Sequence, residues 1–223
     1  MSDRCSEEMG VIRDQEEQIK CPLCGSENTA RYIYGYPDYS EEMQKKLDEG
    51  KWVLGGCCLE CVEVNGRQVS IRPAGKCNDC KKDFATEPIL ISSKGDSGED
   101  YRDIVTCIKF SIGGYFGGYT YITIKKNSDG ACVSVMQMPI CKEIMEDRQI
   151  TLLEWQNIVD TLYGQLYLHE WENRFVDPRI MDGTQWKLEI TMTGNRERTY
   201  AGSNAYPPYW DELTSIFEKY AEV

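Results

Sequence analysis

Two short stretches determine how the N-terminal part of this chain folds: Cys21-Pro22-Leu23-Cys24-Gly25 and Lys76-Cys77-Asn78-Asp79-Cys80. In each stretch two residues separate a pair of cysteines, so one tight turn can bring both thiolates to the same ion. Two such turns supply the four sulfur ligands that zinc prefers in a tetrahedral arrangement. Gly25 favours the first turn because glycine readily adopts a positive φ. We therefore predict a zinc site formed by Cys21, Cys24, Cys77 and Cys80.

A third pair, Cys58 and Cys61, offers a competing set of ligands. Together with Cys77 and Cys80 it has the spacing C-x2-C-x15-C-x2-C, which is also typical of zinc sites. We favour the first set because the Cys57–Cys61 stretch lacks the proline and glycine that shape a tight turn. Four cysteine ligands normally make a closed site, so the predicted role of the ion is structural.

The two cysteine turns resemble those of the zinc-ribbon (rubredoxin-like) family, and the resemblance covers about residues 20–84. It implies two hairpin tips, called knuckles, that face each other across one ion. The chain departs from a short ribbon because 52 residues separate Cys24 from Cys77. A helix and a strand must fit into this insertion.

Composition and charge limit the classes of protein to which this chain can belong. The chain has 223 residues, of which 41% are hydrophobic, eleven cysteines and a formal net charge of −12 at pH 7. We expect no signal peptide and no membrane span, because no apolar run is long enough. We expect a cytoplasmic protein, since reduced cysteines in CxxC pairs favour metal over disulfides. The negative charge opposes nucleic-acid binding, which depends on neutralising phosphates.

Charge and turn residues divide the chain into four parts. Residues 1–19 are predicted to be a disordered or weakly helical tail. The zinc-ribbon domain follows over residues 20–90, and the Ser/Gly/Asp-rich segment within 91–103 is predicted to be a linker. Residues 104–223 are predicted to form the second domain. In the first domain we expect strands over 31–34, 51–54 and 68–72, with a helix from Asp38 or Ser40 to Asp48.

The second domain has the pattern of an α+β fold. The predicted elements, in order, are strands 104–112, 119–126 and 131–138, a helix from Thr151 to about 168, strands 185–192 and 198–201, and a helix over 207–220. This order, β-β-β-α-β-β-α, predicts an antiparallel sheet with helices on one face. On the first helix we expect a buried stripe formed by Leu152, Trp155, Val159, Leu162 and Leu166.

No catalytic motif emerges from the sequence. His169 is the single histidine, and we interpret it as structural. The Gly113–Gly118 run lies between two predicted strands, so we interpret it as a bent hairpin rather than a phosphate loop. The carboxylates Asp177, Asp182, Asp211 and Glu212 show no recognisable pairing.

The densest aromatic and polar segment of the C-terminal part comprises residues 182–186 and 202–210. It is similar to a recurrent domain of uncharacterised bacterial proteins, and this resemblance implies no function. Asn204, Tyr206 and Tyr209 could line a groove there, although packing of Trp186 and Trp210 in the core is the interpretation we favour.

These observations favour a zinc-stabilised protein-interaction module of unknown partner, and its acidic charge would suit a basic protein. An immunity or antitoxin-like protein, in which an acidic face blocks a basic toxin, is one specific version. The first alternative is an enzyme with a carboxylate-based site in the C-terminal domain. The second is nucleic-acid binding by the ribbon through Lys76, Lys81 and Lys82, which we do not expect because the region Lys20–Phe84 has equal numbers of acidic and basic residues.

Overall fold

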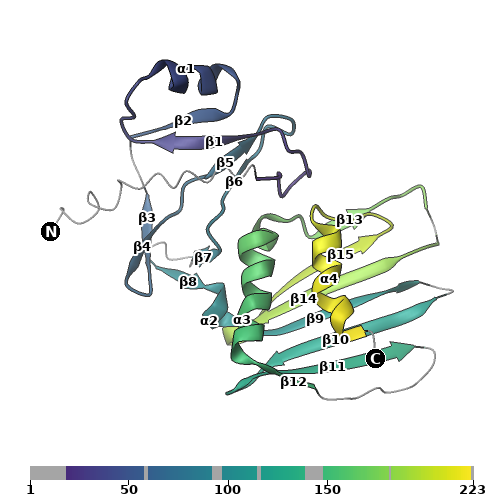
Figure 1. Cartoon of the computed structure of the whole chain (residues 1–223). Helices are drawn as coiled ribbons and strands as arrows, with labels where there is room; N and C mark the ends of the chain where they lie inside the picture. Colours follow the sequence, from purple (N-terminus) through teal and green to yellow (C-terminus); the bar gives the residue numbers. More distant parts are fainter. Residues whose placement is uncertain are drawn as a thin grey trace. The chain divides into compact units, whose positions relative to one another are not determined.

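The computed structural model describes residues 19–57, 60–91, 97–114, 117–138, 148–180 and 182–221 (Figure 1). The predicted tail therefore lies outside the described residues, apart from residue 19. The fold is of the mixed α+β class, as predicted. The chain divides into two compact units: Ser26–Glu99 with the chain up to Cys21, and Asp100–Val223 with Pro22–Gly25. The division after Glu99 falls within the segment 91–103 that the sequence suggested as a linker.

The first unit contains a four-stranded sheet in the order β2-β1-β5-β6. Strand β1 (Thr29–Tyr34) runs parallel to β2 (Trp52–Gly56) and antiparallel to β5 (Gly75–Cys77). Strand β6 (Asp83–Phe84) completes the hairpin with β5. Because β1 and β2 are parallel, a crossover must join them.

Helix α1 (Glu41–Asp48) provides that crossover. The Ser40 side chain accepts a hydrogen bond from the Met43 amide at 3.1 Å, which confirms Ser40 as the N-cap. Gly50, at φ +66°, follows the end of the helix. The sequence thus predicted this helix correctly, because its cap and stop signals are both local.

The first unit also contains two smaller pairs of strands. Strands β3 (Cys61–Val64) and β4 (Arg67–Ser70) form a hairpin, and β7 (Ile89–Ile91) pairs with β8 (Gly98–Asp100). Their core is a small apolar cluster formed by Val62, Val64, Val69, Ile71 and Ile89. The sequence did not predict β3, because its first residue is Cys61, which we had assigned to a cysteine turn.

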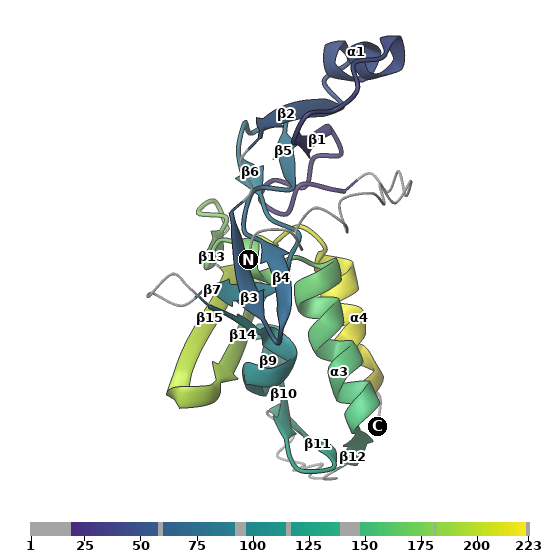
Figure 2. The ribbon, with the colours of Figure 1, turned by 90° about the vertical axis from the view of Figure 1, so that its left-hand side faces the viewer.

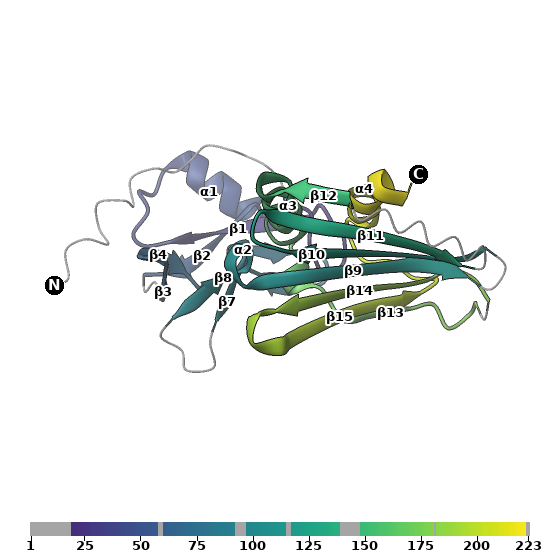
Figure 3. The same cartoon turned by 90° about the horizontal axis from the view of Figure 1, so that it is seen from below.

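The second unit begins with the short helix α2 (Tyr101–Ile104) and is built on a seven-stranded sheet (Figure 3). Its order is β12-β11-β10-β9-β14-β15-β13, and its pairs are antiparallel except for the parallel pair of β13 with β15. The strands are β9 (Val105–Gly114), β10 (Gly118–Lys126), β11 (Gly130–Met138), β12 (Arg148–Thr151), β13 (Arg174–Val176), β14 (Gln185–Met192) and β15 (Arg196–Ser203).

Helices α3 (Leu152–Asp160) and α4 (Trp210–Ala221) lie side by side on one face of this sheet (Figure 2). Alternate strand residues such as Ile108 and Leu188 are fully buried beneath them. Phe110 of β9 stacks on Phe217 of α4 with ring centroids 4.4 Å apart. The core of the second unit is therefore the layer between its sheet and its two helices.

The predicted order of elements omitted two strands, β12 and β13. Both are short and lie at the edges of the sheet, where the alternation of apolar residues is too brief to be recognised. The last helix begins at Trp210 rather than residue 207, since Tyr209 has a φ of +63° that interrupts helical geometry. Leu152 was also assigned wrongly to the buried stripe, because 41% of it is exposed at the start of α3.

Candidate metal centre

The two cysteine turns follow the same backbone path. The amide of Cys21 donates to the Ser26 carbonyl at 2.7 Å, and the amide of Cys77 donates to the Lys82 carbonyl at 2.9 Å. Each bond closes a turn over the same number of residues. The residue after the second cysteine has a positive φ in both turns, +77° at Gly25 and +63° at Lys81. The chain thus contains two structurally equivalent knuckles.

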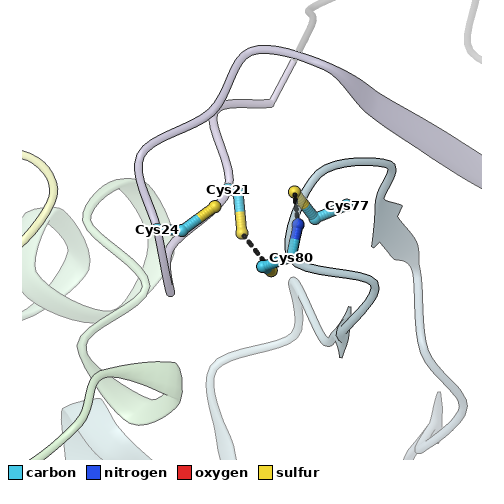
Figure 4. Close-up of side chains that lie close together, drawn as sticks. All are labelled: Cys21, Cys24, Cys77 and Cys80. Atoms are coloured by element: carbon cyan, nitrogen blue, oxygen red, sulfur yellow. Dashed lines mark hydrogen bonds between the residues drawn. The ribbon is translucent and has the colours of Figure 1, made fainter.

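The knuckles bring four thiol groups together (Figure 4). The Sγ atoms of Cys21, Cys24, Cys77 and Cys80 all lie within 4.8 Å of one another. The Cys21 and Cys80 Sγ atoms are 3.9 Å apart. Bonds of about 2.3 Å in a regular tetrahedron would place zinc-bound sulfur atoms roughly 3.8 Å apart. The four cysteines can therefore hold a metal ion with little movement.

Burial differs among the four thiols. Cys21 and Cys77 are fully buried, Cys80 is half-buried and Cys24 is exposed. The Cys80 amide also points at the Cys77 sulfur at 3.5 Å, an interaction that favours a thiolate. With four sulfur ligands an ion would have no open position for a substrate or water, so the donor set suits a structural role.

A polar network joins the second knuckle to the chain just after the first. Asn78 donates its amide to the Asn28 carbonyl at 2.8 Å, and its side chain contacts the Asn28 side chain at 3.0 Å. The side chains of Ser26 and Asn28 donate to Asp79, and these bonds lower the pKa of the Asp79 carboxyl. The network holds the knuckles in register. The sequence did not reveal it, because cysteine spacing carries no signal for it.

Phe84 packs against strand β5, which leads into the second knuckle. It is 2% exposed, and its ring covers Gly75, where a Cβ atom would lie 2.4 Å from the ring. Gly75 therefore permits a close approach of the ring to strand β5.

The competing ligand set is only partly described. Cys58 lies outside the described residues, whereas Cys61 is half-buried at the start of β3. Among the described residues, the four cysteines of the knuckles are the one group of His, Cys, Asp and Glu side chains close enough to hold a metal. The Cys77 and Cys80 sulfurs thus lie with the first pair of cysteines, as the favoured set requires.

His169 does not belong to that group. Its side chain is 7% exposed and its ring centroid lies 6.4 Å from those of Tyr101, Tyr163 and Tyr167. The Nε2 atom lies 3.9 Å from Glu170. The imidazole is thus packed within an aromatic cluster, in keeping with its interpretation as structural.

The acidic candidates occupy separate places. Asp177 forms an ion pair with Arg179 at 2.8 Å, which lowers the pKa of the Asp177 carboxyl. Asp211 and Glu212 lie in the first turn of α4, where negative charge complements the helix dipole. Asp182 is exposed. Asp177, Asp211 and Glu212 thus each have a structural explanation, and none of them requires an acid–base pair.

The remaining candidates, namely the basic residues of the second knuckle, the glycine run and the C-terminal aromatic segment, also have structural explanations. Lys81 and Lys82 are exposed at the second knuckle, next to Asp79 and Asp83 in the chain, so positive charge there alternates with negative charge. Gly114 pairs with Gly118 across β9 and β10, which agrees with the hairpin interpretation of the glycine run. In the C-terminal segment, Trp186 is buried and lies 5.0 Å from Trp210 between ring centroids.

Comparison with known protein families, with curated proteins and with solved structures found no match in any of the three. None of the helices that the structure describes combines the length and apolar character needed to cross a lipid bilayer.

Proposed function

We propose that this chain is a zinc-stabilised protein-interaction module. The observation that carries the zinc assignment is the pair of equivalent knuckles, whose four sulfur atoms lie within 4.8 Å of one another. Sulfur ligands in a tetrahedral arrangement favour zinc over magnesium or calcium, which prefer oxygen. In this proposal the ion holds a zinc-ribbon-like fold together and takes no part in a reaction.

The segment between β1 and α1 is the proposed binding surface of the first unit. Tyr36 is 93% exposed and Tyr39 is 66% exposed. Acidic side chains at Asp38, Glu41 and Glu42 are exposed beside them in the chain. Exposed tyrosines are frequent anchors of protein interfaces, and the acidic neighbours would attract a basic partner.

The metal site and this surface are joined by strand β1. Thr29 of β1 pairs with Cys77 of the second knuckle, and β1 ends at Tyr34, two residues before Tyr36. Loss of the ion would release the knuckle, then the strand, and with it the tyrosine segment. Zinc would thus control whether the binding surface is presented.

The acidic character of the whole chain supports the same proposal. A net charge of −12 would speed association with a basic protein and oppose binding to nucleic acids. An immunity or antitoxin-like protein that covers a basic toxin is the specific version that we favour.

Affinity capture from the native cell extract tests the proposal, using the full-length zinc-loaded protein after nuclease treatment. The wild type should retain a basic protein in stoichiometric amount and release it at moderate salt. Tyr36→Ser combined with Tyr39→Ser should abolish retention, because it removes both exposed aromatic rings. Asp38→Lys should weaken retention, because it replaces a negative charge with a positive one.

Leu153→Ser provides the matched control, because Leu153 is 67% exposed on α3, away from the segment in the chain. It should retain the same partner as the wild type. If the tyrosine variant retains the partner equally well, or if the wild type retains none, the proposed binding surface is wrong.

A further inference from the structure

One face of the seven-stranded sheet faces away from helices α3 and α4 (Figure 2). Its side chains alternate with those of the core, as shown by exposed Lys109 between buried Ile108 and Phe110. Several large apolar side chains of this face are well exposed: Tyr121 37%, Met136 40%, Met138 45% and Val176 45%. We call it the open face.

Strand register arranges the open face in rows that cross the sheet. The first row includes Lys125, Cys107, Thr191 and Glu197, from β10, β9, β14 and β15 in turn. The second row contains Thr123, Lys109, Glu189 and Thr199 in the same strand order. In the first row Lys125 and Glu197 lie on the second strand from the boundary between β9 and β14, on opposite sides of it. In the second row Lys109 and Glu189 lie on the two strands that meet at that boundary.

This arrangement is complementary to itself. A two-fold axis parallel to the strands, placed over the boundary between β9 and β14, would lay β9 of one copy over β14 of the other and β10 over β15. Lys109 would then face Glu189 of the second copy, and Lys125 would face Glu197. Glu189 also contacts Lys187 in its own chain at 2.9 Å. Opposite charges would thus meet on both sides of the axis.

Side-chain size follows the same rule in the next two rows. Tyr121 lies in a row with Ala201, and Tyr119 lies in a row with Ser203, in each case at mirrored positions. The same operation places Met138 of β11 over Val176 of β13. The tyrosines would therefore face small residues, and Met138 would face Val176, whereas Met136 would face Arg174, whose aliphatic stem can pack on it.

The open face carries side chains of both charges. The outward side chains of β9–β11 and β13–β15 include four basic residues, namely Lys109, Lys125, Arg174 and Lys187, and two acidic ones, Glu189 and Glu197. The chain as a whole has a net charge of −12. The open face thus lacks the strong negative charge of the chain as a whole, and the cross-copy pairs Lys109–Glu189 and Lys125–Glu197 offset the repulsion between two faces of like net charge.

We propose that two copies of this chain associate through the open face, sheet against sheet, about a two-fold axis parallel to the strands. The proposal is independent of the zinc site and of the tyrosine segment of the first unit. Its distinctive consequence is that Lys125 pairs with Glu197 only between copies. Three strand spacings, about 14 Å, separate them within one sheet.

Sedimentation equilibrium of the full-length protein tests the proposal. The wild type should show reversible association to twice the mass of one chain. Lys125→Glu should weaken it on the order of tenfold or more, because two pairs of like charges then meet, and Glu197→Lys should do the same. An equimolar mixture of the K125E and E197K chains should recover the association, since each interface pair again joins opposite charges.

Circular dichroism and thermal unfolding of each variant verify that the exposed substitutions leave the fold intact. Recovery in the mixture supports the proposed axis and register. A wild type that stays monomeric at every concentration overturns the proposal. This is also the result expected if the open face binds another protein instead of a second copy. Association that K125E and E197K leave unchanged, or that their mixture fails to recover, overturns it as well.

Discussion

At the scale of single residues, the two knuckles place different side chains on the same backbone path. Gly25 and Lys81 occupy equivalent positions with φ values of +77° and +63°. Glycine adopts this conformation without steric cost, whereas a side chain brings its Cβ close to the carbonyl. The second knuckle therefore carries a local strain that the first avoids.

Lys81→Gly should stabilise the first unit. Relief of the left-handed strain, offset by the greater freedom of glycine in the unfolded chain, should raise the free energy of unfolding by roughly 0.5–1 kcal/mol. Denaturant unfolding of the zinc-loaded protein measures this change. Lys82→Gly is the matched control, because Lys82 lies next in the chain outside the left-handed region, and it should destabilise. Equal destabilisation by both variants would show that the strain at Lys81 has no energetic effect.

The sequence favoured Cys21, Cys24, Cys77 and Cys80, the four cysteines that lie together in the structure, because two cysteines separated by two residues can share one turn. The choice between ligand sets rested on Pro22 and Gly25, which are also local signals. The bonds from Ser26 and Asn28 to Asp79 were not predictable, since they depend on the pairing of β1 with β5 across some fifty residues of chain.

At the scale of elements, a carboxylate joins the two helices of the second unit. Glu154 of α3 accepts hydrogen bonds from Lys219 at 2.9 Å and from Tyr220 at 2.8 Å, both on α4. The Lys219 ammonium is the main cause that lowers the pKa of the Glu154 carboxyl. This contact links the helices outside their apolar core.

Glu154→Gln should destabilise the second unit in a pH-dependent way. Because the folded-state pKa of Glu154 is lowered, its ionisation stabilises the fold above the unfolded-state pKa. This contribution is lost as pH falls through the folded-state pKa. We expect a difference of about 0.5–1 kcal/mol between wild type and E154Q at neutral pH, partly screened by solvent, that shrinks below about pH 4.

Thermal unfolding at several pH values measures this difference, and Glu218→Gln is its control on the exposed side of α4. The control should behave as the wild type does at every pH. A constant difference between wild type and E154Q across the acidic range would contradict an electrostatic role for Glu154.

Elements with strong local signals were predicted well, and short edge strands were not. Helix α1 has its Ser40 cap, and strands β9 to β11 have long alternating patterns. Strand β13 has three residues and is defined by its parallel pairing with β15, which local sequence does not encode. Strand β3 was not predicted, because its first residue, Cys61, was considered as a metal ligand and not as a strand residue.

At the scale of the whole molecule, the two units have different sources of stability. The second unit buries a large apolar layer between its sheet and its helices, including Trp155, Leu188 and Phe217. The core cluster of the first unit is formed by a few small side chains around Val62 and Val69. A small domain of this kind usually requires a metal or disulfides to fold.

Removal of the proposed zinc ion should therefore unfold the first unit selectively. A strong chelator should abolish one of two calorimetric transitions and leave the transition of the second unit, because ion binding contributes directly to folding of a small metal domain. Hydrogen exchange should show loss of protection in β1 and β5 and unchanged protection in β9 and β14. Loss of both transitions, or of neither, would contradict separate sources of stability.

The most direct test of the metal centre is the zinc content of three purified forms by native mass spectrometry. The forms are the wild type, a variant with Cys21→Ser and Cys24→Ser, and a variant with Cys58→Ser and Cys61→Ser. We expect one zinc per chain in the wild type and in the C58S/C61S variant, and none in the C21S/C24S variant. Zinc retained by C21S/C24S and lost from C58S/C61S would contradict this expectation.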